Sequence, residues 1–306
     1  MSKSVEEILI KIPVVRQLIF IAKKIKLPGF GGLSAFDLIK TYLYGIVEGT
    51  FTSRAGSIAF SFFMALFPFL LFVLNLIPYV PVENFQQEFI SFIQAILPPQ
   101  TTDFFLPIVQ DISAHQRGGL LSFVFLLTIF LMANGVNAIF SGFEYSVHVT
   151  INRNFIKQYF MALVVSVFLA LLLLVTVVII VYSEYAIVKL QSEDLLSENF
   201  QWIATVRYII FVVMIYLVIS ILYYFGTKEG KSSRFFSVGA LVTTLLFMLT
   251  TFLFSVYINN FSRYNELYGS IGALLILMLY IWINANLLLL GFELNATLKT
   301  LQNKKC

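Results

Sequence analysis

Three charged residues of this 306-residue chain border long apolar segments, where burying a charge costs free energy. Arg54 precedes the first such segment, Glu144 follows the second, and Glu293 lies near the end of the last. An arginine between carboxylates can close a gate, or bind an anionic substrate when a carboxylate moves away. The same residues would also serve as a structural tie between helix ends, or extend to the membrane surface. The sequence leaves these alternatives open.

Polar residues recur at helical spacing inside four of the apolar segments. In the second segment, for example, Asn134, Asn137 and Glu144 share one helix face at about 100° per residue. In a membrane, such a face is expected to point toward the bundle interior or a wet cavity rather than toward lipid. The candidate substrate path or gate comprises Arg54, Ser61, Pro68, Asn75, Asn134, Asn137, Glu144, Thr244, Thr251, Tyr280, Asn284, Glu293 and Asn295.

Pro68 lies in the middle of the first apolar segment. Proline lacks an N–H and its ring clashes with the carbonyl four residues earlier, so we expect a kinked helix. The kink would act as a hinge or as a static bend that shapes packing.

The composition shows which elements must position these residues. Hydrophobic residues make up 59% of the chain and charged residues 12%, whereas a soluble domain usually devotes about a quarter of its residues to charge. Six segments are long and apolar enough to cross about 30 Å of hydrocarbon as helices. They are 55–80, 119–142, 160–183, 204–225, 235–258 and 269–296. The sequence therefore predicts an all-α fold, a polytopic membrane bundle of six transmembrane helices plus interfacial amphipathic helices.

Three regions follow from this pattern. Residues 1–34 form an amphipathic, basic extension on the cytoplasmic side, residues 35–298 the transmembrane domain, and residues 299–306 a cytoplasmic tail. An ordinary soluble arm is the alternative for the extension. The loop 81–118 is expected to hold two short amphipathic helices, with a packed loop cap as the alternative.

Basic residues are distributed unequally between the two sides of the predicted bundle. Sixteen of the 20 Lys and Arg lie in the N-terminal segment, the two even-numbered loops and the C-terminal tail. The positive-inside rule places these segments, and hence both termini, in the cytoplasm. We expect a multi-pass protein of the bacterial inner membrane.

The sequence offers little for enzymatic chemistry. Its one cysteine, Cys306, has no partner for a disulfide or a thiolate metal site. His115 and His148 fall in loops on opposite sides of the predicted membrane and are expected at the surface. Phosphodiester hydrolysis needs a cluster of carboxylates or histidines that hold metal in a wet groove. We therefore expect neither an enzyme nor a cofactor, and no nucleic-acid partner.

Several short segments carry a resemblance to a known family. They are Arg54-Ala-Gly-Ser-Ile-Ala59-Phe, Ala65-Leu-Phe-Pro68, Tyr268-Gly-Ser-Ile-Gly-Ala273, Tyr280-Ile-Trp282 and Gly291-Phe-Glu-Leu-Asn-Ala296. With these segments the chain resembles the YihY/BrkB family of inner-membrane proteins, which was formerly named ribonuclease BN, a label now regarded as mistaken. Where the family usually shows Gly-Ala-Glu, this chain has Gly291-Phe292-Glu293, which keeps the carboxylate. The resemblance implies six membrane helices, and links to serum resistance, envelope lipid or precursor export and sodium/proton exchange.

The expected function is transport or export of a lipid, a lipid-linked envelope precursor or another amphiphile. Polar faces on four segments, the proline in the first and the charges at one mouth favour this hypothesis. A sodium/proton antiporter is the second hypothesis, and a non-transporting scaffold for envelope assembly is the third. Membrane lipids are the expected partners, and the sequence does not specify an oligomeric state or a substrate.

Overall fold

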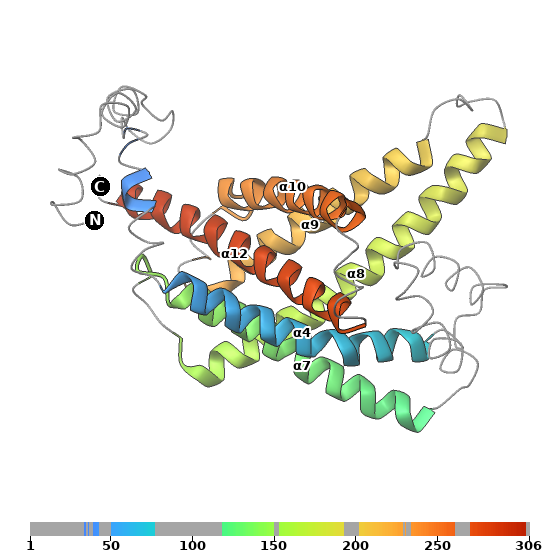
Figure 1. The fold of residues 1–306 in the computed structure, drawn as a ribbon, viewed down its shortest axis with the longest axis horizontal. Helices are drawn as coiled ribbons and strands as arrows, with labels where there is room; N and C mark the ends of the chain where they lie inside the picture. Colours follow the sequence, from blue (N-terminus) through green and yellow to red (C-terminus); the bar gives the residue numbers. More distant parts are fainter. Residues whose placement is uncertain are drawn as a thin grey trace.

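The computed structural model describes residues 34, 36, 39–42, 50–76, 118–149, 153–192, 202–228, 230, 234–260 and 270–303. Residues 1–33 of the predicted extension 1–34, the loop helices and the last three residues lie outside this part of the chain. Within it, six long α-helices dominate the fold (Figure 1). They are α4 (Phe51–Leu76), α7 (Gly118–Glu144), α8 (Phe155–Ser192), α9 (Trp202–Gly226), α10 (Val238–Asn260) and α12 (Ser270–Asn303).

Five of these described helices, α7, α8, α9, α10 and α12, are long and apolar enough to cross a membrane. The prediction of a polytopic membrane bundle is therefore confirmed. The remaining helix, α4, corresponds to the first predicted span and has 26 residues, or about 39 Å at 1.5 Å per residue. That it also crosses the membrane stays a prediction.

The six helices form a closed ring in which α4, α7, α8, α9, α10 and α12 each contact the next, and α12 contacts α4. Two contacts, from α7 to α9 and from α7 to α12, cross the ring. Neighbouring helices run antiparallel, because hydrogen bonds join the start of one to the end of another, as from Arg54 to Gly142 and from Gly239 to Asn295. We call the end that holds the starts of α4, α8 and α10 and the ends of α7, α9 and α12 the packed end.

Buried apolar side chains gather toward the packed end. At the centre, the rings of Phe143 and Phe292 stack with their centroids 4.1 Å apart, and Tyr223 meets Phe143 edge-on at 5.5 Å. The remaining core residues come from the same halves of the helices, for example Ile58 of α4 and Ile219 of α9. Toward the opposite end, most large apolar side chains of the described helices are exposed, so this part of the bundle is tightly packed at one end and more open at the other.

Helix α8 is the most exposed element of the ring. It has 38 residues, about 57 Å of helix, and 17% of its most apolar stretch is buried, against 39% for α7. Side chains such as Phe168, Leu174 and Val178 point away from the protein. In a membrane this surface contacts lipid, because lipid tails are as apolar as leucine.

Helix α4 continues through Pro68, which is buried. The Pro68 carbonyl accepts a 2.8 Å hydrogen bond from the Thr128 hydroxyl of α7. Proline in α4 thus lies against a neighbouring helix that supplies a donor, and its role as a hinge or a static bend stays a prediction.

Helices α10 and α12 approach each other closely at two glycines. A methyl group built on Gly239 would collide with the Gly291 carbonyl, and one built on Gly291 would collide with Thr243 Oγ1. Small residues allow membrane helices to pack at such short separation. Directly beside them, the Tyr223 hydroxyl of α9 lies 2.7 Å from Thr243 Oγ1 and donates to the Leu288 carbonyl at 2.7 Å. This polar contact joins α9, α10 and α12.

Replacing Tyr223 by phenylalanine is expected to lower the free energy of unfolding by about 1–2 kcal/mol. The ring and its packing on Phe143 remain, but the buried hydroxyl and its two hydrogen bonds are lost. Unfolding of the detergent-solubilised protein, followed by tryptophan fluorescence, measures the change. Tyr182→Phe on the exposed face of α8 is the control and should leave stability unchanged; equal stability of both variants would contradict the structural role.

Candidate functional site

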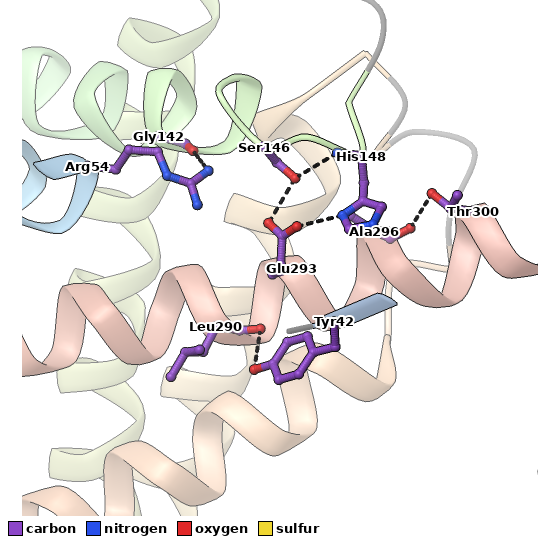
Figure 2. Close-up of polar contacts among 9 residues, drawn as sticks. All are labelled: Tyr42, Arg54, Gly142, Ser146, His148, Leu290, Glu293, Ala296 and Thr300. Carbon is purple, nitrogen blue, oxygen red and sulfur yellow. Dashed lines mark hydrogen bonds and ion pairs between the residues drawn. The ribbon is translucent and has the colours of Figure 1, made fainter. Parts of the chain in front are cut away.

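The most deeply buried charged residue of the described chain is Glu293 of α12, whose exposed fraction is 0%. Its Oε2 atom accepts a 2.8 Å hydrogen bond from Ser146 Oγ, and its Oε1 atom lies 2.6 Å from His148 Nδ1 (Figure 2). The Ser146 hydroxyl in turn accepts from the backbone N–H of His148 at 3.2 Å. Both partners stand in the turn directly after α7, so this turn is fastened to α12 through one carboxylate.

The expectation that His148 is a surface residue is wrong. Its side chain is 6% exposed, and it forms an ion pair with Glu293 when the imidazole is protonated. No local pattern indicated this contact, because 145 residues separate the partners. One signal could have found it: a carboxylate inside an apolar helix needs a buried hydrogen-bond donor.

Arg54 of α4 lies beside this pair, as the expected gathering of the charges at one mouth of the bundle predicted, but it is held differently (Figure 2). Its Nη1 donates to the Gly142 carbonyl at 2.9 Å, and its guanidinium carbon lies 5.5 Å from the centre of the Phe51 ring. Glu293 attracts it electrostatically, yet no salt bridge joins the two among the described residues. Arg54 is 6% exposed, and its Nε and Nη2 have no hydrogen-bond partner among the described residues.

Glu144, the third charge of the expected cluster, belongs to a separate group. Its Oε1 accepts from the backbone N–H of Arg153 at 3.3 Å. Its Oε2 lies 2.8 Å from the Gln158 side-chain amide, which donates to it in the amide orientation that satisfies both groups. Arg153 donates through Nη1 to the Phe225 carbonyl at 2.6 Å. Burial lowers the pKa of Arg153, and the neighbouring Glu144 opposes this shift. The group joins the end of α7 to α8 and α9, which fits the structural-tie alternative for Glu144.

Tyr42 completes the surroundings of Glu293 from the segment before α4. Its hydroxyl donates to the Leu290 carbonyl of α12 at 3.1 Å (Figure 2). Burial, and next the negative charge of Glu293, raise the pKa of Tyr42 to about 12, so the hydroxyl stays protonated and remains a donor. The sequence did not single out this residue.

A second polar group of predicted site residues lies in the more open half of the bundle. The Thr251 hydroxyl of α10 and the Tyr280 hydroxyl of α12 are 2.8 Å apart in an exposed contact. One turn along α12, Asn284 donates to the Tyr280 carbonyl at 2.9 Å, and its Oδ1 is buried with no partner among the described side chains and backbone groups. The structure thus brings three of the predicted residues together between α10 and α12.

Two further predicted residues are used within the packed end. Asn295 accepts from the backbone N–H of Gly239 at 2.8 Å and donates to Ser237 at 2.7 Å, which anchors the start of α10 on α12. Thr244 donates to the Ala240 carbonyl of its own helix at 2.8 Å. These contacts stabilise helix packing.

The remaining predicted residues are scattered. Asn137 lies 3.2 Å from the Gln158 amide. Ser61 and Asn134 are half-buried, and their side chains form no hydrogen bond with the described residues. The side chain of Asn75 lies outside the described part of the chain. In the described ranges, no three His, Cys, Asp or Glu side chains gather as a metal site would require.

Comparison with known proteins identifies the family. The model of the family named virulence factor BrkB matches residues 43–305. The putative ribonuclease-like protein YfkH of Bacillus subtilis is 29% identical over 258 residues, which cover 83% of this chain and 92% of that protein. A UPF0761 membrane protein of Coxiella burnetii is 24% identical over 267 residues, with 84% and 91% covered.

A third relative, a UPF0761 membrane protein of Alteromonas mediterranea, is 32% identical over 90 residues, or 29% of this chain and 31% of that protein. No solved structure matches the chain. The family match covers nearly all of the described helices, and the structure supplies the apolar helices of a multi-pass membrane protein. The chain therefore belongs to the virulence factor BrkB family of membrane proteins.

Proposed function

We propose that the protein moves an amphiphile, a lipid or a lipid-linked envelope precursor, across the bacterial inner membrane. The observation that carries this proposal is the unequal packing of the ring. Core side chains fill the packed end, while the opposite half holds exposed hydroxyls on α10 and α12. A carrier of amphiphiles needs both features, a barrier at one end and polar groups that a headgroup can reach.

The contact between Thr251 and Tyr280 supports the proposal further. Both hydroxyls lie inside helices that are apolar enough to span a membrane, and their contact is exposed. Polar groups at such positions are costly when they face acyl chains and are expected to line a wet or substrate-filled space. A headgroup that accepts or donates hydrogen bonds would find partners there.

Basic residues support an orientation with the packed end in the cytoplasm. Arg54, Arg153, Lys228 and Arg234 lie at the ends of helices that meet there. The opposite side of α8 and α9 carries Lys189 and Arg207. By the positive-inside rule, the more basic end faces the cytoplasm, and the open half then faces the outer side of the membrane.

Replacing Tyr280 by phenylalanine is expected to slow lipid movement roughly fivefold, the effect of losing one neutral hydrogen bond to the headgroup. Stability should change by less than about 0.5 kcal/mol, because the contact with Thr251 is exposed and Thr251 keeps its bond to the Phe247 carbonyl. The measurement uses proteoliposomes that contain a lipid whose tail and headgroup carry fluorescent labels. An impermeant reductant bleaches the labelled lipid of the outer leaflet.

Tyr182→Phe on the exposed surface of α8 is the matched control and should transport as the wild type does. If the wild-type protein moves no lipid in this assay, transport of amphiphiles is excluded and a scaffold role gains support.

The sodium/proton antiporter remains a second candidate because of one observation. Glu293 and His148 form a buried pair of titratable groups, which a proton-coupled mechanism requires. Proton flux in vesicles that depends on sodium and needs no lipid substrate would favour this candidate over the first.

A further inference from the structure

The guanidinium of Arg54 presents one unused edge. Nη1, on the side of Cδ, is bound to the Gly142 carbonyl, while Nε and Nη2 have no partner in the part of the chain that the structure describes. These two nitrogens are adjacent donors on the same edge, and their parallel N–H groups match two oxygens of one carboxylate or phosphate group. Buried donors without a partner are rare in folded proteins, and each calls for an explanation.

The neighbouring carboxylate does not use this edge. Both oxygens of Glu293 are already engaged, one by Ser146 Oγ at 2.8 Å and the other by His148 Nδ1 at 2.6 Å. Tyr42, a further polar side chain near Glu293, directs its hydroxyl to the Leu290 carbonyl. The positive charge of Arg54 is therefore compensated at a distance, and its bidentate edge is left for another anion.

The helix start that carries Arg54 has free donors of its own. Arg54 stands in the first turn, and its own backbone N–H bonds to the Thr50 carbonyl at 3.3 Å. The N–H groups of the three preceding helical residues have no partner within the helix, and the first turn contains no acidic side chain. Helix starts of this kind favour phosphate groups because the helix dipole and the free N–H groups act together.

The backbone before α4 is strained at a single described position. Thr50 adopts a φ of 46°, which is unusual for a β-branched residue. Such strain is found at ligand clamps and switch segments, where the surrounding structure holds an unfavourable conformation. Thr50 directly precedes α4 and lies four residues before Arg54.

We propose that Arg54, at the start of α4, binds a phosphate group through Nε and Nη2. The inference deepens the proposed function, on which it rests for its biological meaning, by naming the headgroup class of the amphiphile. The phosphate belongs either to a lipid headgroup or to a free phosphate compound, since both present the same two oxygens.

The experiment measures binding of phosphatidic acid with a fluorescent tail to the full-length protein in phosphatidylcholine nanodiscs. Arg54→Gln, which removes the charge, should weaken binding about ten- to a hundredfold, the effect of losing a pair of hydrogen bonds to an ionised group. Arg54→Lys, which keeps the charge but removes the planar edge, should give an intermediate loss. Unchanged binding by both variants would overturn the proposal.

Arg207→Gln provides the matched control, because Arg207 is an exposed arginine that pairs with Glu184 away from this site. It should bind phosphatidic acid as the wild type does, and an equal loss in this variant would show general electrostatic attraction to the anionic lipid instead. If Arg54→Gln does not fold, the comparison of Arg54→Lys with wild type decides the question by itself.

Competition by inorganic phosphate separates the two sources. Displacement of the lipid by millimolar phosphate would point to a free phosphate compound, and resistance to it would point to a lipid headgroup; both outcomes need Arg54.

Failure of transport is distinguishable from failure of this site. Binding that depends on Arg54 without lipid movement would refute transport alone, whereas movement of lipids that is insensitive to Arg54 would refute the phosphate site alone.

Discussion

Replacing Glu293 by alanine is expected to lower the free energy of unfolding by about 3 kcal/mol, because removal of one partner of a buried pair leaves the other uncompensated. Here the loss leaves the His148 imidazole and the Ser146 hydroxyl without their acceptor. It also removes the negative charge that compensates Arg54. Equilibrium unfolding in detergent micelles, read by the fluorescence of Trp202 and Trp282, measures the effect.

Glu184→Ala is the control for this experiment. Glu184 pairs with Arg207 at 2.9 Å, but the two side chains are 46% and 50% exposed, so the pair contributes about 0–1 kcal/mol. The double variant of Glu293→Ala with His148→Ala should be less destabilised than the sum of the single variants, since the two residues share one interaction. Strict additivity would contradict the contact.

Replacing Gly291 by alanine should destabilise the bundle by at least about 3 kcal/mol, at the upper end of what overpacking usually costs. The added methyl group would collide with Thr243 Oγ1 and lie 2.5 Å from the Tyr223 hydroxyl and 2.9 Å from the Gly239 carbonyl. Neither hydroxyl can turn away without losing a buried hydrogen bond, and the carbonyl is part of α10. Yield of monodisperse protein and its thermal unfolding in detergent measure the outcome.

Gly56→Ala in α4 is the matched control, because a methyl group built there has no neighbour within 4 Å. Alanine favours the helix over glycine by up to about 1 kcal/mol, so this variant should be as stable as the wild type or slightly more stable. A Gly291→Ala protein that unfolds like Gly56→Ala would disprove the close approach of α10 and α12.

The positions of the helices were largely predictable, because the length of an apolar run is a local property of the chain. The second predicted span, 119–142, falls within α7 at Gly118–Glu144. The limits of α8 were less predictable: it extends to Ser192, nine residues beyond the predicted end. Polar residues such as Glu184 and Lys189 mark the end of the apolar run, but they do not end a helix that continues into water.

The contacts of the site were predictable only in part. The predicted topology placed Arg54 and Glu293 at one depth, since depth follows from position along a span. It did not reveal that His148 and Ser146 bind the Glu293 carboxylate, because a turn that folds back onto another helix leaves no periodic pattern in the sequence. The more open half was also hidden, since side chains that face lipid and side chains that fill the core are equally apolar.

The length of α8 has a consequence for the level at which the bilayer meets the protein. About 57 Å of helix in about 30 Å of hydrocarbon would need a tilt near 60°, beyond the usual range of up to about 40°. The last turns of α8, from Tyr182 to Ser192, are therefore expected to project beyond the acyl chains. Tyr182 and Tyr185, both exposed, are then expected to lie in the headgroup layer. The ion pair between Glu184 and Arg207 joins these projecting turns to α9 in water.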